Sequence, residues 1–121
     1  MKSKELNELQ NKLKKFANDR NWQQFHSPKN LVMALSGEVG ELTEHFQWLS
    51  ESDSYLINNN ETLDEVTHEV ADVFLYLLQI CEKLDIDLVK AANEKIILNE
   101  NKYPIDKSKG SCVKYNKRDS T

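Results

Sequence analysis

Residues 62–84 read TLDEVTHEVADVFLYLLQICEKL, and apolar side chains recur through this stretch every three or four residues. That period is typical of an α-helix. Between Val70 and Ile80 the helix is apolar on nearly every side. A helix that is apolar all round is buried all round. We therefore expect it to pack against other helices and, in so small a protein, against another subunit.

Two helices are predicted before this stretch. The first runs from about Ser3 to Arg20, with leucines at helical spacing. After a short polar and aromatic loop, the second begins at Pro28. Ser27 is placed to cap its N-terminus, because serine is a favoured N-cap and proline is tolerated at the first helical position. Its apolar period continues to about Leu49.

The third and fourth helices have their own start signals. Residues 50–61 form a polar loop, after which Thr62 and Glu65 have the spacing of a capping box. Asp85 or Asp87 is expected to cap the fourth helix, which ends before Pro104. The sequence beyond shows no helical period, and we expect it to be extended or mobile.

Composition agrees with an all-α protein. The chain has 121 residues, 39% of them hydrophobic, and contains 3 Gly and 2 Pro, too few turn formers for a β-sandwich. The length suits one domain. We predict a four-helix domain over residues 1–104, followed by a basic C-terminal tail over residues 105–121.

Charge is unevenly distributed along the chain. The 53 residues from Asn30 to Glu82 hold 11 acids and neither Lys nor Arg, whereas Pro104 to Thr121 holds five bases against two acids. Without a basic stripe in the main body, nucleic-acid binding is not expected. The N-terminus is polar, without a signal peptide, and no apolar run is long enough for a membrane span. We therefore expect a cytoplasmic protein.

Two carboxylate pairs stand out in the acidic segment: Glu38 with Glu41, and Glu69 with Asp72. Residues three apart are neighbours on a helix face. Glu38 falls within the apolar stripe of its helix, and Asp72 interrupts the apolar run of the third helix. A buried carboxylate must be protonated, pair with a base or bind a metal, and this segment has no Lys or Arg. Four oxygen ligands suit Mg²⁺, with Mn²⁺ as a substitute.

Other readings of the acidic residues are weaker. Glu65 and His68 match half of a di-iron motif, but no second Glu-x-x-His exists in the sequence. His68 is expected to be exposed or at an interface. The remaining acids are expected to be solvated: Glu44, Glu51, Glu61 and Asp64.

Taken together, the sequence resembles the MazG-like group of all-α nucleotide pyrophosphohydrolases, and within it the small dCTP pyrophosphatases. The segments that carry the resemblance span nearly the whole chain: Phe16–His26, Asn30–Leu42, Phe46–Trp48, Glu69–Asp72, Tyr76 and Asn99–Pro104.

The resemblance implies which residues form the site. Glu38, Glu41, Glu69 and Asp72 would hold Mg²⁺ and serve catalysis by polarising the triphosphate and activating water for attack at the α-phosphorus. Contacts with the nucleotide would come from aromatic and polar side chains and from bases: Trp22, Phe25, His26, Trp48, Tyr76, Lys29, Lys95, Asn99 and Lys102. For Phe25, closing the core at a helix corner is an equal alternative. Larger relatives carry a histidine at the position of Leu13.

The activity implied is hydrolysis of a deoxynucleoside triphosphate, best dCTP or a modified dCTP, to the monophosphate and pyrophosphate. The cellular role implied is cleaning of the nucleotide pool. The family is typically a homotetramer built as a dimer of dimers. Two alternatives stay open: the same superfamily acting on dUTP or phosphoribosyl-ATP, and a non-catalytic helical interaction module.

Overall fold

The computed structural model describes residues 3–117, of which all regular structure is helical. Four long helices follow one another along the chain, confirming the predicted all-α class. These residues fall into two compact units, one ending at Ile86 and the other beginning at Asp87. The predicted division at residue 104 stays a prediction. No helix within residues 3–117 is both long and apolar enough to cross a membrane.

Helix α1 (Lys4–Asp19) begins as predicted, with the Ser3 hydroxyl accepting a hydrogen bond from the Leu6 N–H. Helix α2 (Pro28–Glu44) is capped by Ser27, whose hydroxyl accepts from the Asn30 N–H at 3.1 Å. Between them, the short 3₁₀ turn η1 (Gln23–Phe25) interrupts the loop. The Ser27 cap confirms the prediction, because serine before proline is a local signal, whereas the Ser3 cap was not predicted.

The predicted end of α2 near Leu49 is wrong. The helix ends at Glu44, and the chain then turns through hydrogen bonds of the tighter i→i−3 kind, His45 N–H to Leu42 O and Phe46 N–H to Thr43 O. The apolar period continues across this turn, so the sequence pattern alone did not mark the boundary.

Helix α3 (Asn60–Lys83) begins earlier than predicted. The Asn59 side chain caps it by accepting from the Thr62 N–H at 3.3 Å, so Thr62 lies inside the first turn instead of forming a capping box with Glu65. Asparagine is as good an N-cap as threonine or better, which explains why the earlier residue is used. The preceding loop contains one more 3₁₀ turn, η2 (Asp53–Tyr55).

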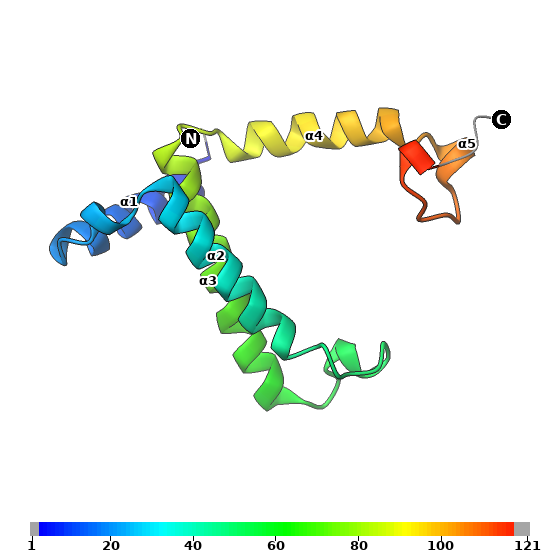
Figure 1. The fold of residues 1–121 in the computed structure, drawn as a ribbon, viewed down its shortest axis with the longest axis horizontal. Coiled ribbons are helices and arrows are strands. Elements are labelled where there is room, and N and C mark those ends of the chain that lie inside the picture. The colour runs from blue at the N-terminus through cyan, green and yellow to red at the C-terminus, as the bar shows by residue number, and fades with distance from the viewer. Residues whose placement is uncertain (1–2, 118–121) are drawn as a thin grey trace. The chain divides into compact units, whose positions relative to one another are not determined.

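The first unit is built on α2 and α3, which lie side by side and run in opposite directions, with α1 packed on α3 (Figure 1). Leu31 of α2 and Leu78 of α3 are fully buried at the centre. The Gln10 side chain of α1 is also buried and donates a hydrogen bond to the Leu78 carbonyl at 3.0 Å. This contact satisfies a buried amide and fixes α1 on α3.

The third helix is less buried within one chain than its composition predicts. Val70 is 50% exposed, and Phe74 and Leu77 are exposed as well. Asp72 is exposed, which corrects the prediction that its apolar neighbours bury it. Three helices leave part of the α3 surface uncovered, because α2 and α1 contact only part of its circumference.

The second unit begins with α4 (Leu88–Lys102), capped by the Asp87 carboxylate, one of the two caps predicted. Two short pieces follow, α5 (Ile105–Ser108) and the 3₁₀ turn η3 (Tyr115–Lys117). The prediction of an extended tail is therefore wrong for these two pieces, which are helical. Pro104 explains α5, because its fixed φ suits the start of a helix. Arg118 and Asp119, which were counted in the basic tail, lie outside the described residues.

Candidate active site

Helices α2 and α3 bring the predicted carboxylates together. Glu38 and Glu41 lie on one face of α2, and Glu69 and Asp72 lie on one face of α3. One carboxylate oxygen from each of Glu38, Glu41 and Glu69 lies within 4.8 Å of the other two. Asp72 is not in this group, although its charge acts on Glu38. Two helix faces thus meet at a cluster of three carboxylates.

Two oxygens of this cluster are buried without a partner. Glu38 Oε2 and Glu69 Oε2 are shielded from solvent, and no group within residues 3–117 donates a hydrogen bond to either. Leaving a buried charged acceptor unsatisfied is costly. The donor set consists of hard carboxylate oxygens, which Mg²⁺ and Mn²⁺ prefer. The residues present therefore fit a divalent cation of this kind.

Burial and the closeness of the carboxylates also shift the pKa values of groups in and beside the cluster. Burial, followed by the neighbouring carboxyls of Glu41 and Glu69 and the charge of Asp72, raises the pKa of Glu38 from 4.5 to about 7. Burial and the charges of Glu38, Asp72 and Glu41 raise the pKa of the Tyr76 hydroxyl. The phenol therefore stays protonated and can donate a hydrogen bond.

A cavity of about 460 Å³ opens beside the cluster. Glu38 and Asp72 form one part of its wall, and the α1 side forms the other. The full lining combines apolar, aromatic and polar side chains: Leu9, Lys12, Leu13, Phe16, Ala17, Trp22, His26, Glu38, Asp72, Leu75, Tyr76 and Gln79. A cavity of this size with convergent polar groups is typical of a small-molecule site.

Three predicted nucleotide contacts lie in this cavity. Trp22, His26 and Tyr76 all line it. The Trp22 ring packs edge-on against Phe16, with ring centroids 5.7 Å apart, and against His26 at 6.4 Å. The loop before α2 therefore presents a connected aromatic wall to the carboxylate helices.

Three other predicted contacts of the first unit do not line the cavity: Phe25, Lys29 and Trp48. Phe25 is 58% exposed and Trp48 is 88% exposed, and Trp48 follows the end of α2, whereas Trp22 precedes its start. Lys29 is exposed at the first turn of α2. Lys95, Asn99 and Lys102 all belong to α4, in the second unit.

Sequence reasoning missed Lys12. It lines the cavity and is the sole Lys or Arg to do so among the residues described. A signal was present, because Lys12 stands at helical spacing among Leu9, Leu13 and Phe16, a cation in an apolar stripe. Gln79 was also missed, since its spacing marks it only as a polar interruption of α3.

Comparison with known proteins gives the same picture. The model of the MazG-like family matches residues 33–117. The dCTP pyrophosphatase 1 of Rattus norvegicus is 40% identical over 104 residues, which are 83% of this chain and 59% of the rat protein. The Homo sapiens protein of the same name is 38% identical with the same coverage. The chain thus spans about three fifths of the length of these relatives.

A solved structure matches the fold. A pyrophosphatase from Archaeoglobus fulgidus superposes with a TM-score of 0.77 at 38% identity, covering 86% of this chain and 96% of that chain. The family model extends over most of the chain and includes the four carboxylates of α2 and α3. The chain therefore belongs to the MazG-like family.

Proposed function

We propose that this chain is a nucleoside triphosphate pyrophosphohydrolase that depends on Mg²⁺. The observation that carries the proposal is the cluster of Glu38, Glu41 and Glu69 beside a cavity with an aromatic wall. Similarity to proteins named dCTP pyrophosphatase 1 supports the reaction class. The products would be a nucleoside monophosphate and pyrophosphate.

The metal would be held by Glu38, Glu41 and Glu69, with Asp72 close enough to affect Glu38. A bound Mg²⁺, or Mn²⁺ in its place, supplies positive charge to phosphate oxygens and lowers the pKa of bound water. These four carboxylates are also the proposed catalytic residues, since no other acidic cluster borders the cavity within the described residues.

The cavity wall would bind the rest of the nucleotide. Trp22 and His26 offer ring faces and edges for the base, and stacking on an aromatic face contributes about 1–3 kcal/mol. Tyr76 keeps its proton and can donate to the substrate. Lys12 can neutralise part of the triphosphate charge. Six further contacts remain proposals: Phe25, Lys29, Trp48, Lys95, Asn99 and Lys102.

We propose dCTP, or a modified dCTP, as the substrate, with cleaning of the nucleotide pool in the cytoplasm as the role. The test is a panel of nucleoside triphosphates with Mg²⁺, in which pyrophosphate and orthophosphate are measured separately. We expect pyrophosphate release, fastest from a cytosine nucleotide. No release from any nucleotide would exclude the enzyme. A preference for dUTP or phosphoribosyl-ATP would replace dCTP as the proposed substrate and keep the reaction within the same superfamily.

A non-catalytic helical module is the alternative from a different class. The unpartnered Glu38 and Glu69 oxygens argue against it, since a module without ligand gains nothing from them. Thermal unfolding with and without Mg²⁺ and dCTP separates the two, because a ligand that binds only the folded state raises the melting temperature. No shift with either ligand would favour the module.

We also propose that the chain assembles as a homotetramer, a dimer of dimers. The exposed apolar side chains Val70, Phe74 and Leu77 of α3 support burial against another copy. Light scattering of the purified protein measures the mass directly. A monomer at micromolar concentration would contradict this assembly.

A further inference from the structure

The loop that carries Trp22 and His26 packs on α1 through the Trp22 ring but has no buried residue. It joins α1 to α2 across residues 20–27, and none of these residues is buried. Its internal hydrogen bonds are short-range, such as the Trp22 N–H to the Ala17 carbonyl at 2.8 Å and the His26 N–H to the Gln23 carbonyl at 3.2 Å. These bonds shape the loop but do not fix it against α3, where the carboxylates and Tyr76 lie.

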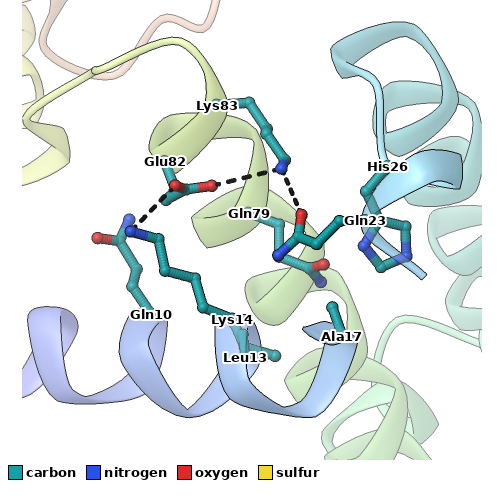
Figure 2. A pocket seen from close by; sticks show the side chains of 9 residues that line it. All are labelled: Gln10, Leu13, Lys14, Ala17, Gln23, His26, Gln79, Glu82 and Lys83. Carbon is teal, nitrogen blue, oxygen red and sulfur yellow. Dashed lines mark hydrogen bonds and ion pairs between the residues drawn. The ribbon is translucent and has the colours of Figure 1, made fainter. Parts of the chain in front are cut away.

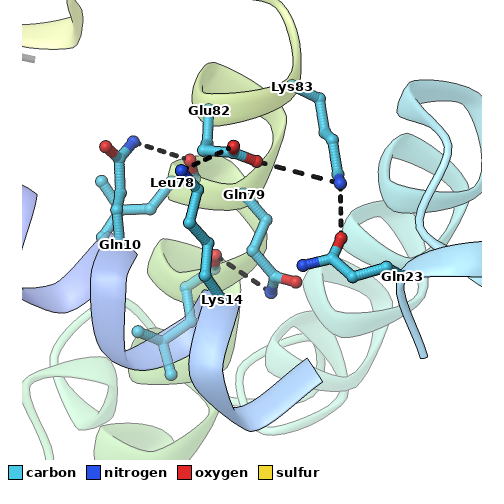
Figure 3. Close-up of polar contacts among 8 residues, drawn as sticks. Gln10, Lys14, Gln23, Leu78, Gln79, Glu82 and Lys83 are labelled. Carbon is cyan, nitrogen blue, oxygen red and sulfur yellow. Dashed lines mark hydrogen bonds and ion pairs between the residues drawn. The ribbon is translucent and has the colours of Figure 1, made fainter. Parts of the chain in front are cut away.

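One side-chain hydrogen bond makes that connection. Lys83 Nζ, in the last turn of α3, donates to Gln23 Oε1 in η1, across 60 residues of sequence. Within residues 3–117 it is the only hydrogen bond between this loop and α3. Figure 3 shows the two side chains pointing toward each other from their separate elements. We call this contact the Lys83–Gln23 tether.

Glu82 connects Lys83 of the tether to Lys14 of α1. Glu82 Oε2 lies 3.9 Å from Lys83 Nζ, and Glu82 Oε1 lies 3.3 Å from Lys14 Nζ of α1. The series Lys14, Glu82, Lys83 and Gln23 therefore joins α1, α3 and the loop (Figure 3). Holding Lys83 in place through Glu82 reduces the entropy lost when it binds Gln23.

This network shares a wall with the candidate active site. It surrounds a cavity of about 10 Å³, enough for about one water. Four residues line both this cavity and the larger one: Leu13, Ala17, His26 and Gln79. In Figure 2 His26 and Gln23 approach the cavity together from the loop side. His26 thus has the network on one side and the cavity of Glu38 and Asp72 on the other.

We infer that Lys83 and Gln23 are positioning residues that hold Trp22 and His26 against the carboxylate helices and thereby set the affinity for the nucleotide. The inference rests on the proposed function for its substrate, but the tether can be tested without one. Neither residue contacts the carboxylate cluster, so loss of the tether should weaken nucleotide binding and leave metal binding unchanged.

The central variant is Lys83→Met, which keeps the apolar stem and removes the donor. A hydrogen bond to a charged group that holds a loop in its bound conformation has an effect of about three- to tenfold on affinity. With dCTP as the probe, we expect KM to rise by about that factor. The value of kcat and the Mg²⁺ concentration for half-maximal rate should stay within about twofold of wild type.

Matched variants separate positioning from general effects. Lys15→Met removes a lysine of the same chemistry whose ion pair, with Asp19 at 2.7 Å, stays within α1, and should leave KM unchanged. Lys83→Arg keeps a charged donor and should restore KM. Gln23→Leu removes the acceptor and should reproduce Lys83→Met, also serving if Lys83→Met fails to fold.

A second readout needs no activity. The chain has 2 Trp, so in a Trp48→Phe background the fluorescence reports Trp22 alone. Without nucleotide, acrylamide should quench Trp22 more strongly when Lys83→Met is added. If wild type hydrolyses no nucleotide, the proposed function fails while this quenching still tests the tether. Unchanged quenching in both tether variants, or equal losses in kcat, Mg²⁺ affinity and KM, would overturn the inference.

Discussion

Glu38 should make the metal-free protein lose stability as the pH rises. Its pKa is raised from 4.5 to about 7 in the folded state, by burial first and by the neighbouring carboxyls of Glu41 and Glu69 second. The folded state therefore binds a proton more tightly than the unfolded state. Between about pH 4.5 and 7 the free energy of unfolding falls as pH rises, and above the folded pKa the loss is complete.

The magnitude follows from the shift. One pKa unit corresponds to about 1.4 kcal/mol, so the rise in the Glu38 pKa gives at most about 3.5 kcal/mol. Glu38 is partly accessible, and screening by solvent lowers the measured value below this limit. Glu38→Gln keeps the shape and cannot ionise, so it should remove this part of the pH dependence. Relative to wild type, the variant should gain stability from pH 5 to pH 8.

The assay is urea unfolding followed by circular dichroism, in EDTA, at fixed protein concentration and ionic strength. Glu51→Gln is the matched control, because Glu51 is exposed in the loop before α3 and should leave the pH profile of wild type unchanged. Equal pH slopes for wild type and Glu38→Gln would refute the reasoning. When Mg²⁺ replaces EDTA in the same assay, it should stabilise wild type more at pH 8 than at pH 5.5. It should have little effect on Glu38→Gln.

Three further predictions concern single side chains. Asp72→Ala should abolish pyrophosphate release but change the free energy of unfolding by less than about 0.5 kcal/mol, because Asp72 is exposed. Glu51→Ala is the control and should keep normal turnover. Full activity of Asp72→Ala would exclude Asp72 from the site. Lys12→Met should raise KM for a triphosphate more than for the matching diphosphate, since Lys12 lines the cavity with the carboxylates; equal changes for the two would show that it does not meet the terminal phosphate. His45→Ala should lower the free energy of unfolding by less than about 1 kcal/mol at pH 6, because the contact between His45 Nδ1 and Glu65 Oε2, at 3.5 Å, is partly exposed. A larger loss, measured by urea unfolding, would show that His45 stabilises the fold by more than this contact.

Local signals were the ones that sequence could supply. Ser27 and Asp87 each cap a helix by accepting from an N–H three residues on, so residue type and spacing are enough to predict such caps. For the fourth helix the sequence left two candidates, Asp85 and Asp87. The carboxylate pairs were visible for the same reason, since i and i+3 share a helix face. That the two pairs meet required only that α2 and α3 pack in register.

Long-range and boundary features were not visible. The apolar period of α2 continues past Glu44, although the helix ends there. The tighter turn at His45 does not interrupt the spacing of apolar residues, so the sequence pattern does not mark the helix end. Lys12 and Gln79 reach the cavity only because α1 packs on α3, a contact that no local pattern specifies. The Lys83–Gln23 tether joins positions 60 residues apart and has no sequence signature at all.

The acidic segment links the proposed metal binding to the stability of the fold. Helices α2 and α3 hold three carboxylate oxygens within 4.8 Å of one another, and His45, which follows the end of α2, lies with its Nδ1 3.5 Å from Glu65 Oε2 of α3. Without a cation the cluster repels itself, and Glu38 responds by keeping its proton near neutral pH. A cation that binds the cluster must displace this proton, so its affinity should rise with pH as the folded protein loses stability without it. The proposed binding of Mg²⁺ would therefore be coupled to folding through the proton of Glu38, and residues 30–82 contain no Lys or Arg to pair with these carboxylates instead.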